Sequence, residues 1–151
     1  MGKIKKLRPE KTRKGLDNPE SFFLEAERYY NNAKERLKEA KVEYNCYQDT
    51  KPVREACAMA YLSVLAALDG YFVSRGVSLD TLPKTTEGYL ASLRKYLVHN
   101  GKLQSAFRVS WENLHVFGYY RGASSIDLVK DGFKNAKVIL DMLSKDRAKS
   151  W

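Results

Sequence analysis

The side chains best suited to chemistry are an arginine and a histidine seven positions apart, Arg108 and His115. Seven residues of α-helix make about two turns, so a helix through this region would carry both side chains on one face. An arginine can hold a phosphate while a histidine moves the proton of an attacking hydroxyl, which is the chemistry of a metal-independent ribonuclease. The alternative, which we favour, is that Arg108 pairs with Glu112 one turn later while His115 packs beside Trp111.

A second group of candidate residues lies between two glycines. Tyr119, Tyr120 and Arg121 can stack or hydrogen-bond, and Gly118 and Gly122 flank them. We predict a glycine-bracketed turn here and assign these three side chains as a candidate binding site. Alternatively, the tyrosines fold back onto the ends of the helices and the arginine is solvated. The segment lacks the Lys-Ser/Thr pair of a phosphate-binding P-loop.

Residue types that bind metals or act as nucleophiles are sparse. The two histidines, His99 and His115, with scattered carboxylates, are too few for a metal site, and we predict neither a metal nor a cofactor. Two cysteines are also too few for a disulfide framework. We expect Cys46 and Cys57 to be reduced, with Cys57 as a small core residue.

The basic residues gather at the two ends of the sequence. The net charge is +9. Residues 1–15 contribute +6 of it, because they hold seven basic residues and one acidic residue, Glu10. The basic side chains of this arm are Lys3, Lys5, Lys6, Arg8, Lys11, Arg13 and Lys14. Such an arm can bind nucleic acid by counterion release, although a solvated tail is the simpler interpretation. We therefore divide the chain into a disordered basic arm (1–16), a single helical-bundle domain (17–144) and a polar C-terminal tail (145–151).

The elements that must position these residues are all predicted to be helices. Residues 49–76 hold an almost uncharged stretch with apolar side chains at helical spacing, capped by Asp49 or Thr50 and ended by Gly76. We predict this segment to be the central helix. The first of the others is expected at about 17–47, after an Asp17-Asn18-Pro19 start. A shorter one is expected at 87–99, capped by Thr85 or Thr86 and ended by Asn100-Gly101. The last two are expected at 102–117 and at 125–143, the latter capped by Ser124 or Ser125. No strand is predicted, so the fold class is all-α: an up-down four-helix bundle with one additional short helix.

The segment YQDTKPVREACAMAYLSVLAALDGYF resembles a small bacterial family of unknown function, of Bacteroidetes and Chlorobi type, with a HEPN-like helical bundle. The residues that carry the resemblance are Tyr30, Ala33, Lys34, Leu37, Asp49, Lys51, Arg54, Tyr61, Asp69, Leu114, His115, Gly118 and Tyr119. The match covers about residues 22–143 and implies a four-helix HEPN-like fold. Arg108 and His115 also resemble the Arg-x(4–6)-His signature of HEPN ribonucleases, but Val109 stands where that signature usually has a polar residue.

These features favour a non-enzymatic helical protein that acts through protein–protein contacts as a homodimer. The warrant is the ten tyrosines of the chain and the near-neutral charge of the body between its two basic ends. Tyr96 and Trp111 are candidates for an exposed apolar dimer face. The alternative is a HEPN-type ribonuclease or RNA-binding protein that uses Arg108 and His115. No apolar run approaches the ~20 residues of a membrane span, because Asp69 and Arg75 interrupt the central helix. The N-terminus lacks the apolar segment of a signal peptide, so we expect no membrane contact and a cytoplasmic location.

Overall fold

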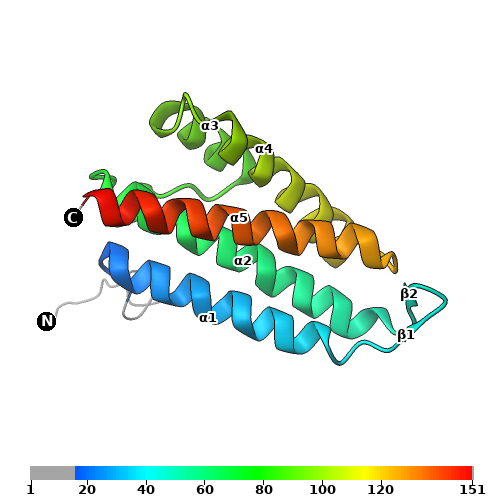
Figure 1. Cartoon of the computed structure of the whole chain (residues 1–151). Helices are drawn as coiled ribbons and strands as arrows, with labels where there is room; N and C mark the ends of the chain where they lie inside the picture. Colours follow the sequence, from blue (N-terminus) through cyan, green and yellow to red (C-terminus); the bar gives the residue numbers. More distant parts are fainter. Residues whose placement is uncertain (1–15, 151) are drawn as a thin grey trace, which may run out of the picture.

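Helices make up most of the chain in a computed structural model that describes residues 16–150, with side chains up to residue 144 (Figure 1). Of the basic arm predicted at 1–16, residues 1–15 lie outside the described residues, and so does the terminal Trp151. The elements are α1 (Pro19–Leu37), β1 (Val42–Glu43), β2 (Cys46–Tyr47), α2 (Thr50–Ser74), the short 3-10 helix η2 (Leu79–Thr81), α3 (Thr86–Tyr96), α4 (Gly101–Ser110), the π-helix η3 (Trp111–Tyr120) and α5 (Ile126–Ser150). The all-α prediction is therefore correct for most of the chain.

Helix α2 is the central element, as predicted. It packs against α1, α4, the π-helix and α5, and most of its side chains are buried. The Asp49 side chain caps its start by accepting a hydrogen bond from the Lys51 backbone N–H. Gly76 has a φ of 96°, and the N–H groups of Gly76 and Val77 donate to the Val73 and Phe72 carbonyls. This Schellman arrangement ends the helix where the sequence predicts.

By length and composition alone, α2 is apolar enough to span a membrane. The sequence criterion that excluded α2 as a membrane span, the presence of Asp69 and Arg75, was therefore too strict. In the fold, 72% of its most apolar window is buried among the other elements. A buried central helix has the same composition as a membrane span because both are apolar on all sides.

The chain between α1 and α2 differs from the prediction of a helix running to Tyr47. Helix α1 ends at Leu37, and residues 42–47 form a two-stranded antiparallel hairpin in which Val42 faces Tyr47 and Glu43 faces Cys46. Tyr44 and Asn45 at its tip have φ values of 53° and 62°, the left-handed conformation of a type I′ turn. The prediction of no strand is thus wrong at this point.

Side-chain caps fix the starts of the other helices. Asn18 forms a capping box with Ser21, and Thr85 caps α3, both as predicted. Asn100, predicted to end the third helix, instead accepts a hydrogen bond from the Leu103 N–H and starts α4. Ser125 accepts one from the Leu128 N–H at the start of α5. The helical backbone of α5 continues to Ser150, through most of the segment predicted as a polar tail.

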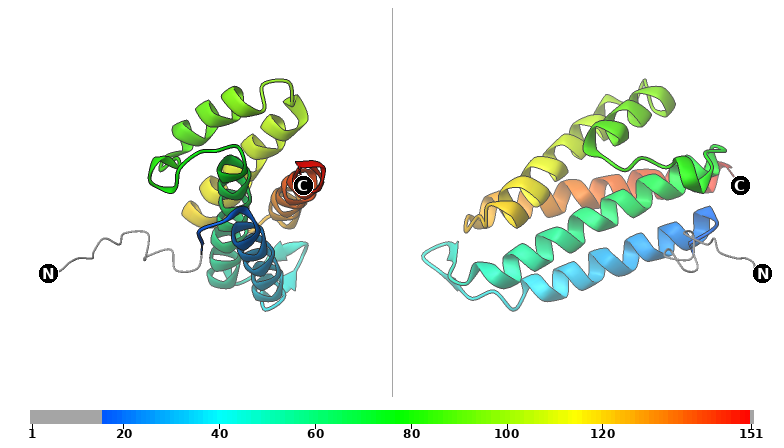
Figure 2. Two further views of the ribbon diagram at one scale, coloured as in Figure 1. Left: turned by 90° about the vertical axis from the view of Figure 1, so that its left-hand side faces the viewer. Right: turned by 180° about the vertical axis from the view of Figure 1, so that it is seen from behind.

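The helices run back and forth along one direction. Helices α1, α2 and α5 lie side by side, while α3 and α4 lie above them at an angle (Figures 1 and 2). The start of α1 and the end of α5 share one end of the molecule. The hairpin, the start of α2, the end of the π-helix and the start of α5 share the other end (Figure 1). The residues predicted to bind a partner are on this second end.

Candidate binding site

The segment that carries the predicted site is a π-helix and not a glycine-bracketed turn. Helix α4 continues without a break into η3, so Gly118, Tyr119 and Tyr120 are helical. The Arg121 N–H donates to the Val116 carbonyl at 2.9 Å, which is the i→i+5 bond of a π-helix. Only after Arg121 does the chain turn towards α5. Segments of π-helix are rare and are frequently found at functional sites.

The π-helix packs closely on one face of α2 because glycines stand at the contacts. Arg54, Cys57 and Tyr61 follow one another at helical spacing on α2. A Cβ atom at Gly118 would lie only 2.4 Å from the Cys57 sulfur, and one at Gly122 would lie 2.5 Å from the Arg54 guanidinium. Gly122 also has a φ of 69°. Glycine is therefore required at 118 by the close contact with Cys57 and at 122 by its positive φ, which explains the spacing that suggested a turn.

His115 lies in a short stack of aromatic rings. Its ring is 5.0 Å from the Tyr61 ring at an interplanar angle of 27°, and 6.0 Å from the Tyr119 ring at 20°. Burial raises the pKa of Tyr61, and a hydrogen bond with Thr86 opposes that rise. His115 is half-buried between a core tyrosine and an exposed one. The stack thus connects the core of α2 to the surface.

The structure does not bring Arg108 and His115 together. Arg108 is exposed on α4, and neither the predicted Arg108–Glu112 ion pair nor a contact between Arg108 and His115 occurs among the described residues. The shared face was predicted for an α-helix, but the wider turns of η3 rotate each residue by a smaller angle. Glu112 and His115 have the Glu-x-x-His spacing of some metal ligands in sequence. Within the described part of the chain, no third metal-binding side chain joins them.

The exposed apolar side chains gather at the end of the molecule that holds the hairpin. Tyr44 is 95% exposed and Tyr120 is 71% exposed. We call the following five exposed residues the aromatic end: Val42, Tyr44, Phe117, Tyr119 and Tyr120. The candidates proposed from sequence, Tyr96 and Trp111, are instead partly buried against the core. The predicted site residues Tyr119, Tyr120 and Arg121 are all exposed.

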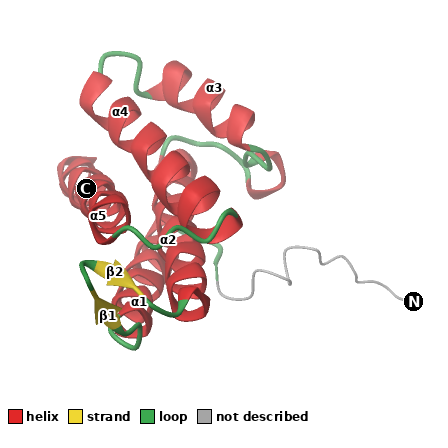
Figure 3. Cartoon of the chain, turned by 90° about the vertical axis from the view of Figure 1, so that its right-hand side faces the viewer, coloured by secondary structure: helices red, strands yellow, loops and turns green. Residues whose placement is uncertain are grey.

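The hairpin is joined to the start of α5 by backbone contacts. The Tyr47 N–H donates to the Ser124 carbonyl at 2.9 Å, and Cys46 forms a β-bridge with Ser125. Figure 3 views this end, where the hairpin and the turn into α5 lie next to each other. The hairpin and the turn that follows the π-helix are therefore joined directly, although more than 70 residues separate Tyr47 from Ser124 in sequence.

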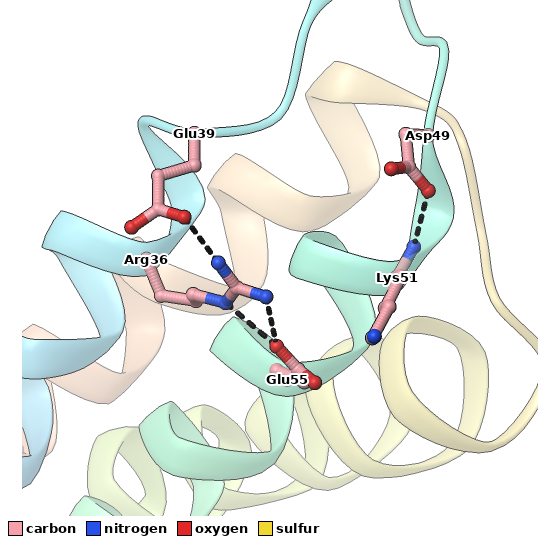
Figure 4. A network of polar contacts seen from close by, with 5 residues as sticks. All are labelled: Arg36, Glu39, Asp49, Lys51 and Glu55. Atoms are coloured by element: carbon pink, nitrogen blue, oxygen red, sulfur yellow. Dashed lines mark hydrogen bonds and ion pairs between the residues drawn. The ribbon is translucent and has the colours of Figure 1, made fainter.

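Charged side chains at the base of the hairpin form a surface network between α1 and α2 (Figure 4). Arg36 contacts Glu39 on its own helix and donates through Nε to the Glu55 carboxylate at 2.6 Å. The hydrogen bond to Glu55 raises the pKa of the Arg36 guanidinium. Asp49 and Lys51 lie nearby, with Asp49 occupied as a helix cap. These groups are paired with one another, so we assign them to holding the helices together.

Both cysteines are free thiols, as predicted. Burial raises the pKa of Cys57 to about 12, so this thiol stays protonated and is a poor nucleophile. Cys46 is half-buried in the hairpin. Neither cysteine contacts a histidine within the described residues, and the structure gives no sign of a cysteine nucleophile paired with a base.

The fold and the site define a small helical protein with an aromatic surface at one end. The chain belongs to a family described as a domain of unknown function (DUF5618), whose sequence profile matches residues 22–145. It is similar to a solved structure described as a protein of unknown function from Dyadobacter fermentans, with 32% identity and a TM-score of 0.72. That match covers 85% of this chain and 98% of the other. Among curated proteins, none matches. The predicted membership of a family of unknown function is confirmed.

Proposed function

We propose that this protein is a non-catalytic interaction module that forms a homodimer through its aromatic end. The observation that carries the proposal is the distribution of exposed apolar side chains. Five of the eight large ones among the described residues lie at this end, and Leu24, Leu62 and Val98 are scattered elsewhere. Tyrosine is enriched at protein interfaces, since its ring offers a large contact area and its hydroxyl a hydrogen bond.

Tyr44 supports an interface more directly than the other four. Its φ of 53° places a bulky residue in the left-handed region, which costs about 1–2 kcal/mol for a residue with a Cβ atom. Its ring is 95% exposed, so burial within the monomer does not offset this cost. A hairpin of this type favours Asn-Gly at the tip, whereas this chain has Tyr44-Asn45. A partner that buries the ring would supply the missing stabilisation.

The charges around the aromatic end favour a second copy of the chain as this partner. In a two-fold symmetric dimer the same surface meets itself, so a surface of one sign would repel its copy. Here the exposed charges of the hairpin, the start of α2, the π-helix and the turn into α5 are balanced. They are Lys41, Lys51, Arg54 and Arg121 against Glu43, Asp49, Glu55, Glu112 and Asp127, and Glu55 is paired with Arg36.

We further propose that the fold is a HEPN-like up-down four-helix bundle, in a bacterial protein of the cytoplasm. The four long segments α1, α2, α4 with η3, and α5 support the bundle assignment, with α3 as the additional short helix. The relative from Dyadobacter fermentans supports a bacterial origin, and the two free thiols suit a reducing compartment. The ribonuclease alternative has no comparable support, because His115 is stacked between tyrosines and Arg108 is not beside it.

The molar mass in solution tests this function. Light scattering of the full chain should give the mass of a dimer, and the double variant Tyr119→Ser/Tyr120→Ser should give that of a monomer. Leu24→Ser is the matched control, since Leu24 is an exposed apolar residue of α1 near the other end. It should remain dimeric. A wild-type protein that is monomeric at all concentrations, or a dimer that dissociates with Leu24→Ser and persists in the double variant, would contradict the proposal.

A further inference from the structure

A cleft opens between α1 and α5 at the end of the molecule opposite to the aromatic end. Its volume is about 300 Å³. It exists because both helices pack extensively on α2 but make few contacts with each other. The floor is apolar and nearly buried, formed by Phe23, Ala26, Tyr30 and Leu140. The Tyr30 hydroxyl donates to the Phe133 carbonyl at 3.2 Å, which holds this ring in the floor.

The rim of the cleft is polar and carries one carboxylate, that of Glu27, with which no cation of the described residues pairs. Lys137 and Asp141 on α5 form an ion pair at 2.7 Å and neutralise each other. Glu27 on α1 is exposed, and no described cation lies within ion-pair distance of it. An apolar floor with a free negative charge on the rim fits a segment that carries both apolar and basic side chains.

We propose that this cleft binds residues 1–15 of the same chain. That segment holds seven basic residues and two apolar ones, Ile4 and Leu7, which suit the rim and the floor. Its binding is independent of the aromatic end and does not rest on the proposed dimer.

The length of the segment allows it to reach the cleft. Glu27 is eight residues beyond Pro19, the first residue of α1, which corresponds to about 12 Å of helix at 1.5 Å per residue. The nine residue-to-residue steps from Leu7 to Leu16 span up to about 30 Å when the chain is extended. The chain can therefore reverse before Pro19 and place Leu7 over the floor. The seven basic residues also give a high local concentration of positive charge near Glu27.

Limited trypsin digestion of the full chain tests this inference, because the segment contains six cleavage sites; Arg8 is followed by Pro9 and is not cleaved. Glu27→Gln should increase the rate of cleavage within residues 3–14 by about threefold, the factor for an exposed charge interaction worth roughly 0.7 kcal/mol. Glu87→Gln is the control, since Glu87 is an exposed glutamate on α3, away from the cleft. It should leave the rate unchanged. Equal rates in wild type and Glu27→Gln would overturn the inference.

A second measurement identifies the contact by a route that does not depend on charge. Leu7→Ser should shift the backbone amide resonances of Ala26, Asn31 and Leu140, which line the cleft, and leave Leu93 on α3 unchanged. The shifts and the trypsin rates should not depend on protein concentration, because the proposed contact lies within one chain. Unchanged resonances in the cleft, or protection that appears only at high concentration, would contradict it.

Discussion

Helix α2 and the π-helix lie side by side, but they differ in helical geometry and in how far their apolar side chains are buried. Helix α2 is regular over 25 residues and buries nearly all its apolar side chains, including Phe72 and Val64. The π-helix is widened throughout its 10 residues and leaves Phe117, Tyr119 and Tyr120 exposed. Burial of apolar surface is the main stabilising contribution to a fold, so the exposed rings contribute little to stability.

The comparison shows where this molecule departs from the arrangement that would best stabilise a monomer. The departures are a tyrosine with positive φ, a long π-helix and exposed aromatic rings, and all of them lie at one end. Proteins generally violate local structural rules at functional sites, where another requirement outweighs stability. The central helix shows no such departure. These departures are the reason why we propose that the aromatic end, and not α2, binds a partner.

The largest expected difference between the two regions is in the response to removal of an aromatic ring. Phe72→Ala should lower the free energy of unfolding by about 3–5 kcal/mol, because the ring is fully buried and leaves a cavity. Tyr120→Ala should change it by no more than about 0.5 kcal/mol, as expected for a surface position. Urea denaturation below the dimerisation concentration measures both. Similar losses for the two variants would show that Tyr120 is part of the core.

Glycine substitutions test the contact between the two helices. Gly118→Ala should destabilise the protein by about 1–3 kcal/mol, since the new Cβ atom would overlap Cys57. Gly101→Ala is the control with the opposite sign. No atom lies within 4 Å of its new Cβ, and alanine is the better helix former, so a gain of about 0.5 kcal/mol is expected. A neutral Gly118→Ala would mean that the π-helix does not pack this closely on α2.

The two cysteines report on the two regions through their reactivity. At about pH 8 a thiol reagent should modify Cys46 in the hairpin and should modify Cys57 only after unfolding. The pKa of Cys57 is raised from 9.0 to about 12, so above pH 9 the unfolded chain loses a proton that the folded chain keeps. Stability should therefore fall as the pH rises above 9, by up to about 1.4 kcal/mol per unit. Equal reaction rates for the two native thiols would contradict this.

The smallest expected effect is at the hairpin tip, where a substitution should stabilise the monomer and not destabilise it. Tyr44→Asn should raise the unfolding free energy of the monomer by about 1 kcal/mol, because asparagine adopts positive φ more readily than tyrosine. The same variant should weaken the dimer. Tyr120→Asn, in a helical position, should weaken the dimer without stabilising the monomer. A Tyr44→Asn variant that is less stable as a monomer would show that the ring has a structural role.

The sequence predicted the elements whose signals are local. The caps at Asn18, Asp49 and Thr85 and the stop at Gly76 were all predicted, because each depends on a few neighbouring residues. The hairpin was missed, since Leu37, Ala40 and Tyr44 keep the spacing of a helix. Its strands are held instead by the backbone contacts of residues 46 and 47 with residues 124 and 125, a tertiary effect that local propensity does not contain.

The site was predicted only in part. Tyr119, Tyr120 and Arg121 are exposed, and their role in binding stays a prediction; the π-helix that carries Tyr119 and Tyr120 has no sequence signature that we recognise. Arg54 and Tyr61 were not assigned to a site. They were among the residues that carry the family resemblance, and in the structure they lie against Gly122 and His115. The contact across two helices, and not any single motif, is what connects these residues.

Hydrogen exchange at two protein concentrations tests the central claim most directly. At the higher concentration, backbone amides of residues 42–47 and 116–123 should become more protected, while those of α1 remain unchanged, because a second copy covers the aromatic end. Protection that does not depend on concentration, or that rises along α1 and not at these two segments, would contradict the account.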